Sequence, residues 1–174
     1  MPKPDSSAVG RIRDRESLAR ITADIRKRGG KVAFTNGCFD LLHVGHIRYL
    51  EEAAKLGTIL VVGLNSDISV ENLKGPRRPL VPQRERAEML AALRSVDYVC
   101  IFDEPTPREL ILALRPDILI KGGDYRRDEL AGGPEVEGWG GRVVLAPEVA
   151  GKSTRNLIEK IARLYRSPER NREG

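Results

Sequence analysis

The sequence predicts an α/β fold in which a mostly parallel, five-stranded sheet carries helices on both faces. Segments with the pattern of a strand alternate along the chain with segments of helical periodicity. Residues 58–64 form a nearly continuous apolar run of strand length, which is typical of a central parallel strand buried on both faces. Because successive parallel strands are joined by right-handed crossovers, this alternation indicates a doubly wound sheet.

The first half of the chain predicts a leading helix and then alternating strands and helices. Apolar residues recur at helical spacing over residues 15–28, and Gly29-Gly30 then supplies the stop that a helix C-terminus favours. The elements expected next are a strand over 31–35, a helix over 47–56, the strand 58–64, a polar Gly/Pro-rich stretch over 65–82 and a helix over 83–94. Met89 and Leu90 are expected to face the core from this last helix.

The second half predicts the remaining strands and two more helices. Thr106 can cap a helix, Pro107 suits its first position because the missing N–H costs nothing there, and Glu109 completes a capping box. The other expected elements are strands over 97–102, 117–120 and 142–146, a Gly-rich loop over 122–141 and a last helix over 153–165. These segments complete the five strands of the predicted sheet.

The chain length of 174 residues fits one domain of common size. Both ends are polar or charged and contain proline, so we expect a mobile N-terminal segment over 1–14 and a mobile tail over 167–174. A single domain is therefore expected over 15–166.

Composition limits the partners and the compartment. The excess of 30 Lys plus Arg over 25 Asp plus Glu suits anionic small molecules as well as nucleic acid, but 5% aromatic residues disfavours base stacking. Cys38 and Cys100 form neither a disulfide framework nor a zinc-binding pair. No apolar run approaches the roughly 20 residues that cross a bilayer. We therefore expect a cytoplasmic protein with no nucleic-acid or membrane partner.

The fold class predicts where the chemistry lies. In an open α/β sheet, ligands bind beyond the carboxyl ends of the strands. The loops expected there are 36–46, 65–78, 121–125 and 147–155. Each of them is rich in polar, charged or glycine residues, so these four loops are the candidate site.

His43 and His46 are the only two histidines, and they lie around Gly45 where the first strand leads into a helix. A helix N-terminus offers free N–H groups and a positive dipole end, so imidazoles there can help hold phosphate oxygens. Gly45 allows a close approach. Alternatively, both histidines cap or pack around the helix start. A metal site would need further ligands that the spacing does not supply.

The stretch Asn36-Gly37-Cys38-Phe39-Asp40-Leu41-Leu42-His43-Val44-Gly45-His46 resembles the signature of the nucleotidyltransferase superfamily that includes the cytidylyltransferases, whose fold is Rossmann-like. Further stretches are similar to one branch, the D-glycero-β-D-manno-heptose 1-phosphate adenylyltransferases. They are Thr35 with the signature, Asn65-Ser66-Asp67, Leu73-Lys74-Gly75 with Arg78-Pro79, Lys121-Gly122-Gly123-Asp124-Tyr125, and Ser153-Thr154 with Asn156. The resemblance covers residues 15–164, nearly the whole expected domain.

The resemblance implies an enzyme that joins ATP and a heptose 1-phosphate to give ADP-heptose and pyrophosphate for lipopolysaccharide cores. It also implies Mg²⁺ carried with the ATP phosphates, with no protein side chain assigned as a metal ligand. The chain is too short for the kinase domain to which this activity is often fused, so a separate heptose kinase and phosphatase are expected. A homodimer or higher homo-oligomer is compatible with Trp139 and the leading helix as contacts.

The resemblance assigns roles residue by residue. The expected catalytic residues are His43, His46 and Lys74. The expected nucleotide-binding residues are Thr35, Asn36, Gly37, Cys38, Phe39, His43, Gly45, His46, Lys121, Gly122, Ser153 and Thr154. The expected substrate-binding residues are Asp40, Asn65, Lys74, Arg78, Arg86, Gly123, Asp124 and Tyr125.

Several of these residues have an ordinary structural alternative. Asp40 and Asp124 suit turns or caps beside glycine, and Arg78 suits a solvated surface. Arg86 matches a family arginine, although an arginine on a helix is usually a solvent contact. Lys152 and Arg155 replace polar neutral residues of the family pattern, which leaves both phosphate contact and solvation open.

Two other functions compete with the adenylyltransferase. One is a cytidylyltransferase for glycerol 3-phosphate or a similar alcohol phosphate, which residues 121–125 disfavour. The other is a non-catalytic module that binds a nucleotide or nucleic acid. Neither Gly-x-x-x-x-Gly-Lys-Ser/Thr nor Gly-x-Gly-x-x-Gly occurs, so a P-loop enzyme and a dinucleotide oxidoreductase are disfavoured.

Overall fold

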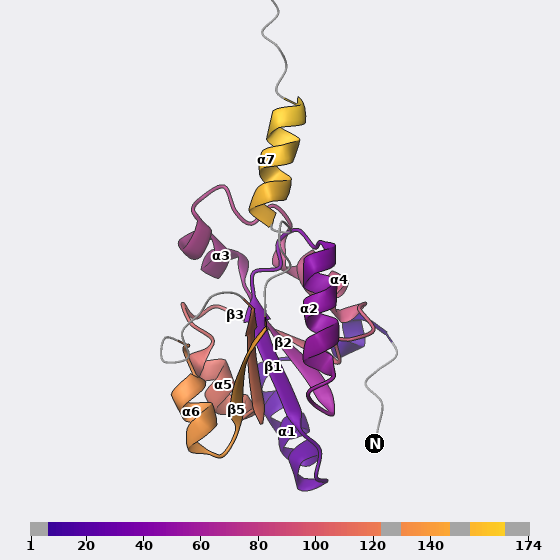
Figure 1. The fold of residues 1–174 in the computed structure, drawn as a ribbon, viewed down its shortest axis with the longest axis vertical. Helices are drawn as coiled ribbons and strands as arrows, with labels where there is room; N and C mark the ends of the chain where they lie inside the picture. The colour runs from indigo at the N-terminus through magenta and orange to yellow at the C-terminus, as the bar shows by residue number, and fades with distance from the viewer. Residues whose placement is uncertain (1–6, 123–129, 147–153, 166–174) are drawn as a thin grey trace, which may run out of the picture.

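The computed structural model describes residues 7–122, 130–146 and 154–165, and its centre is a five-stranded parallel sheet (Figure 1). The strands are β1 (Val32–Gly37), β2 (Ile59–Asn65), β3 (Tyr98–Phe102), β4 (Ile118–Gly122) and β5 (Arg142–Ala146). Their order across the sheet is β3-β2-β1-β4-β5, and every pairing is parallel. The predicted Rossmann-like α/β class is confirmed, and the sheet is parallel throughout.

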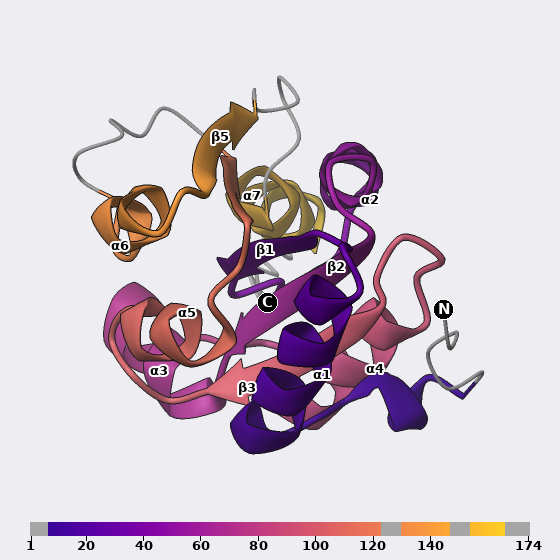
Figure 2. The same ribbon diagram turned by 90° about the horizontal axis from the view of Figure 1, so that it is seen from below.

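Helices cover both faces of the sheet, as Figure 2 shows in a view from below. The helices are α1 (Arg15–Lys27), α2 (Val44–Ala54), α3 (Asp67–Lys74), α4 (Gln83–Ala91), α5 (Arg108–Leu114), α6 (Gly133–Gly138) and α7 (Thr154–Tyr165). Leu18 of α1, Leu110 of α5 and Val136 of α6 share one core cluster. Leu50 of α2 and Leu90 of α4 belong to a second cluster on the opposite face. The sheet therefore separates two apolar layers, as in a doubly wound fold.

The strand order reverses beside β1, which places a crevice at the carboxyl ends of β1 and β4. β1 pairs with β2 on one side and with β4 on the other, and the crossovers leave these strands in opposite directions across the sheet. In open α/β sheets ligands bind at this topological switch point. The predicted location of the site loops follows from this arrangement.

Two helices lie where the sequence predicts only polar or Gly-rich loops. Helix α3 falls within 65–82: the Ser66 side chain accepts a hydrogen bond from Ser69 N, and Gly75 ends the helix with a φ of 93°. Its buried residues are Ser69 and Val70, so it has almost no apolar stripe to reveal it. Helix α6 has six residues, too few for a helical period to appear in the sequence.

Three details of the predicted helices are wrong. Helix α2 begins at Val44, three residues before the predicted start at residue 47, because His43 occupies the N-cap position. Helix α5 begins at Arg108 with Pro107 as N-cap and no side-chain cap, so the predicted capping box with Thr106 does not form. In α4, Met89 is predicted to face the core but is 38% exposed. The charged Arg86 of the same helix is buried instead.

The described part of the N-terminal segment contacts the sheet. A short 3₁₀ helix, η1 (Val9–Arg11), precedes α1. Arg11 Nη1 donates to the carbonyl oxygens of Ala91 and Val96 at 3.3 and 3.2 Å, and Arg13 N donates to Val99 O at 2.9 Å. The domain boundaries remain predictions. Within residues 7–122, 130–146 and 154–165, no helix is long and apolar enough to span a bilayer.

Candidate active site

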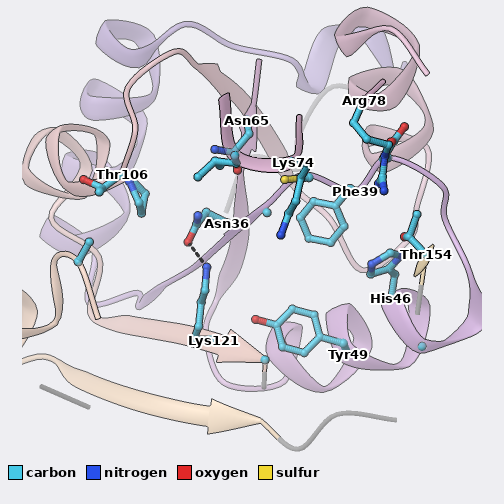
Figure 3. Close-up of a pocket in the computed structure, with 18 of the residues that line it drawn as sticks. Asn36, Phe39, His46, Tyr49, Asn65, Lys74, Arg78, Thr106, Lys121 and Thr154 are labelled. Atoms are coloured by element: carbon cyan, nitrogen blue, oxygen red, sulfur yellow. Dashed lines mark hydrogen bonds and ion pairs between the residues drawn. The ribbon is translucent and has the colours of Figure 1, made fainter. Parts of the chain in front are cut away.

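A pocket of about 580 Å³ opens beyond the carboxyl ends of the central strands (Figure 3). Most of the predicted site residues line it. They are Asn36, Gly37, Cys38, Phe39, Asp40, His43, Gly45, His46, Asn65, Lys74, Arg78, Lys121, Gly122 and Thr154. Segments that are far apart in the sequence therefore meet at one cavity, as the strand-end rule predicts.

The two histidines form one side of the pocket and act as a packed pair. His43 is the N-cap of α2 and His46 lies in its first turn, with His46 N donating to His43 O at 2.9 Å. The two imidazole rings stack with centroids 3.8 Å apart and planes 20° apart. Phe39 meets His46 edge-on at 5.2 Å, with its own backbone in the left-handed region at a φ of 43°. The pair is thus held in a fixed orientation at a helix N-terminus.

His46 is a neutral hydrogen-bonding group. Burial, followed by the neighbouring His43, lowers the pKa of His46 from 6.5 to about 4. Its Nδ1 atom is buried and has no hydrogen-bond partner among the residues that the structure describes. A neutral imidazole carries one N–H and one acceptor nitrogen, so His46 can donate to an anionic oxygen without itself being charged.

We expect the imidazole of His46 to titrate near pH 4 instead of near 6.5. Because its pKa in the folded chain lies below the unfolded value, the unfolded chain takes up the proton first. The stability that this group contributes is therefore complete above pH 6.5 and is lost as the pH falls toward 4. An NMR titration of the two histidine Cε1–H resonances, assigned with His46→Ala, measures the pKa directly. A midpoint near 6.5 would contradict a neutral, half-buried ring.

The opposite side of the pocket is built from the ends of β1 and β4. Lys121 Nζ donates to Asn36 Oδ1 at 3.1 Å, across the switch point between the two strands (Figure 3). Burial lowers the pKa of Lys121, and the nearby Lys74 lowers it further. Two lysines therefore border the same cavity, which makes it suited to an anion with more than one negative charge.

The Tyr49 hydroxyl contacts both strands that form this side of the pocket, β1 and β4. Its hydroxyl shares a 2.6 Å hydrogen bond with the Thr35 hydroxyl and donates to Ile120 O at 3.2 Å. Burial raises the pKa of Tyr49 to about 12. Thr35, predicted to bind the nucleotide, is fully buried and does not line the pocket. Its hydroxyl orients Tyr49, which does line it.

Asp40 lies at the pocket wall, but other groups already bind its carboxylate. Oδ2 accepts from Arg78 Nε at 2.5 Å, and Oδ1 accepts from the backbone N–H groups of Leu80 and Val81 at 2.7 and 3.0 Å. The side chain of Asp40 has no solvent exposure, and that of Arg78 has 20%. The carboxylate therefore ties the loop after β1 to the loop before α4.

Arg86 does not line the pocket, although the sequence predicts it as a substrate-binding residue. It is fully buried in α4 and donates hydrogen bonds to Val81, Cys38, Asn65 and Asp67. Asn65 does line the pocket, and its side chain donates to Ser69 Oγ at 2.9 Å.

Some predicted residues lie outside the described part of the chain. These are Gly123, Asp124, Tyr125 and Ser153, together with Lys152. Thr154 and Arg155, which begin α7, both line the pocket. Thr154 Oγ1 donates to Leu41 O at 3.3 Å, which links the start of α7 to the histidine loop.

The pocket also contains residues that were not predicted as site residues. They are Tyr49, Leu73, Pro105, Thr106, Pro107, Leu119, Leu130 and Ala131. The segment 105–107 follows β3, so the strand-end rule could have marked it, but its capping pattern suggested only a helix start. Tyr49 lies one helical turn after His46, where a ring is usually taken as core.

Mg²⁺ prefers oxygen ligands, which carboxylates often supply in proteins. No three acidic, cysteine or histidine side chains gather among them in a group that could hold a metal ion. The carboxylate of Asp40 is engaged by Arg78. Mg²⁺ takes phosphate and water oxygens as well as carboxylates, so a bound phosphate group would supply oxygen ligands to an ion at this pocket.

Comparisons with known proteins show the family. A family model described as cytidylyltransferase-like matches residues 34–159. The bifunctional protein HldE of Trichlorobacter lovleyi is 56% identical over 155 residues, which are 89% of this chain and 32% of that protein. The HldE protein of Syntrophotalea carbinolica is 57% identical over 155 residues, with the same shares. The chain thus spans 32% of the length of these relatives.

Two solved structures share the fold. The lipopolysaccharide core biosynthesis protein from Thermoplasma volcanium is 28% identical with a TM-score of 0.58, covering 70% of this chain and 98% of that chain. The pantoate-beta-alanine ligase from Francisella tularensis, complexed with beta-gamma ATP and beta-alanine, has a TM-score of 0.60 at 16% identity, over 88% of this chain and 77% of that chain. The second likeness concerns the fold alone.

Proposed function

Because the chain belongs to the cytidylyltransferase-like family, we propose that it joins ATP and D-glycero-β-D-manno-heptose 1-phosphate to give ADP-heptose and pyrophosphate. The observation that carries the proposal is the stacked histidine pair at the N-terminus of α2, with a neutral His46, which faces a pocket bordered by two lysines. The identity of 56% to an HldE protein supports the heptose branch. The likeness to a lipopolysaccharide core biosynthesis protein supports the pathway.

The reaction is attack by the anomeric phosphate oxygen of the sugar phosphate on the α-phosphorus of ATP, with inversion and release of pyrophosphate. The new P–O bond forms as the bond to the pyrophosphate oxygen breaks. No general base is needed, because a phosphate monoester has a second pKa of roughly 6 and is largely dianionic near neutrality. The barrier comes from repulsion between anions, so positioning and electrostatic stabilisation supply the rate.

Different residues of the pocket would position the reactants and stabilise the transition state. His43 and His46, with the free N–H groups of α2, hold the α- and β-phosphate oxygens of ATP. Lys74 reaches into the pocket from the end of α3 and neutralises charge between the reactants (Figure 3). Mg²⁺ bound to the ATP phosphates would withdraw charge from the departing pyrophosphate.

Replacing Lys74 with methionine is expected to lower kcat about tenfold, which corresponds to roughly 1.4 kcal/mol of transition-state stabilisation. The effect is modest because Lys74 is exposed at the end of a short helix, where solvent screens its charge. Steady-state pyrophosphate release measures it. Lys55→Met is the matched control, since Lys55 pairs with Glu52 on the surface of α2, away from the pocket. Equal kcat values for the two variants would show that Lys74 does not contribute to the reaction.

The proposed function is tested by pyrophosphate release from ATP, CTP and GTP, each with heptose 1-phosphate or glycerol 3-phosphate. Release with ATP and heptose 1-phosphate alone is the expected result. Release only with CTP and glycerol 3-phosphate would indicate the alcohol phosphate cytidylyltransferase. Binding of ATP without release in any combination would indicate a non-catalytic module.

We also propose the compartment, the neighbouring reactions and the working form of the enzyme. It would act in the cytoplasm, where ATP is available, between a heptose kinase and phosphatase that supply the 1-phosphate and the enzymes that use ADP-heptose. The segment 15–166 would be the catalytic domain, and the described residues 9–13 pack against its sheet instead of forming a mobile end. A homo-oligomer is proposed as the working form.

A further inference from the structure

Arg86 has the greatest volume of the fully buried side chains among the described residues. Its guanidinium donates from Nε to Val81 O at 2.8 Å, from Nη1 to Cys38 O and Asn65 O at 2.5 and 2.9 Å, and from Nη2 to Asp67 Oδ1 at 2.8 Å. Four of the five N–H donors of an arginine are therefore used within the protein. Little of the group remains available for a substrate.

The four partners belong to three segments that border the pocket. Cys38 lies in the loop that leads from β1 to the two histidines. Asn65 ends β2 and Asp67 begins α3, so this pair marks one strand–helix junction. Val81 lies in the loop before α4. One planar group thus links the histidine loop, the start of α3 and the loop before its own helix.

The functional groups lie at the far ends of the linked segments. His43 follows Cys38 by five residues, and Lys74 is the last residue of the α3 helix that starts at Asp67. A helix moves as a rigid rod, so a displacement at the start of α3 carries Lys74 with it. The contacts of Arg86 consequently fix how far the histidine loop and Lys74 lie from each other.

We propose that Arg86 is a positioning residue that sets the separation between the histidine loop and Lys74 across the pocket, without touching the substrate. The kinetic part of this inference rests on the proposed nucleotidyl transfer. A transition state requires tighter alignment than ground-state binding does, and a shift of about 1 Å can cost about 100-fold in rate. Loss of Arg86 should therefore reduce kcat much more than it changes KM.

The chain offers variants that separate positioning from stability. Arg86→Lys keeps the charge, but one ammonium nitrogen cannot reproduce a planar fork with four bonds. Asp67→Ala cuts only the link to α3, and it should fold because the Asp67 side chain is 42% exposed. Arg11→Lys is the matched control: Arg11 Nη1 donates to three carbonyls at the opposite end of α4 and does not line the pocket.

The experiment measures kcat, KM for ATP and heptose 1-phosphate, the thermal midpoint and amide hydrogen exchange over α3. We expect kcat to fall about 100-fold in Arg86→Lys and about tenfold in Asp67→Ala, with both KM values nearly unchanged. Exchange over α3 should be faster in both variants. In Arg11→Lys the thermal midpoint should fall, while kcat and α3 exchange remain those of the parent protein.

Other outcomes would overturn the inference. A raised KM for heptose 1-phosphate with an unchanged kcat would make Arg86 a substrate ligand. An unchanged kcat in Asp67→Ala would decide against positioning, even where Arg86→Lys fails to fold. If the parent protein releases no pyrophosphate with any substrate pair, this result contradicts the proposed function but not the positioning role of Arg86. Positioning then fails only if α3 exchange is the same in Asp67→Ala, Arg86→Lys and Arg11→Lys.

Discussion

His46→Ala is expected to lower turnover at least about 100-fold while the protein remains folded, the usual scale for losing one preorganised donor to the transition state. The ring is held by stacking on His43 and by the edge of Phe39, so its N–H points at a fixed place before the substrate arrives. Such a donor costs no reorganisation at the moment of reaction. Its removal therefore acts on kcat.

The fold should survive this change because position 46 lies in the first turn of α2 and is not part of either apolar cluster. Alanine also has a higher helix propensity than histidine. Single-turnover pyrophosphate release measures the rate, and the thermal midpoint reports the fold. His46→Gln is the comparison, since an amide keeps an N–H donor and should retain more activity. Near-normal turnover in the alanine variant would refute the role of His46.

Much of the fold and many of the residues that line the pocket could be predicted because they depend on local patterns. Apolar runs and helical periods identify the five strands and the helices that have an apolar stripe. The strand-end rule then brings His46, Lys74 and Lys121 to one pocket, although they are far apart in the sequence. These inferences need no knowledge of which side chains meet.

The remainder depends on contacts that no local pattern contains. Arg86 lies on a helix with a weak apolar stripe, where an arginine is normally solvated, yet its carbonyl partners at the strand ends draw it into the core. Asp40 beside a glycine-rich signature suggests a turn or a sugar contact, whereas its partner Arg78 comes from a loop 38 residues away. Helix α3 is fixed by a serine cap and tertiary contacts, with little apolar signal of its own.

Asp40→Ala is expected to lower the free energy of unfolding by about 3–5 kcal/mol, the scale for removing one partner of a buried ion pair. The change leaves the guanidinium of Arg78 without its carboxylate and leaves the N–H groups of Leu80 and Val81 without their acceptor. A domain is stable by only about 5–15 kcal/mol, so the loss is a large fraction of the total. Urea unfolding at neutral pH measures it.

The control is Glu52→Ala, which removes an acidic partner from the exposed pair with Lys55 and should change stability little. Asp40→Asn separates the two roles given to this residue, because its amide oxygen can still accept from Leu80 N while the charge that attracts Arg78 is lost. An intermediate loss of stability with an unchanged KM for the sugar phosphate would assign Asp40 to the architecture of the site. A stable Asp40→Asn protein with a raised KM would instead favour the sugar contact predicted from the sequence. Equal free energies of unfolding for Asp40→Ala and Glu52→Ala would contradict this prediction. They would mean that the buried pair of Asp40 and Arg78 stabilises the fold no more than the exposed pair of Glu52 and Lys55.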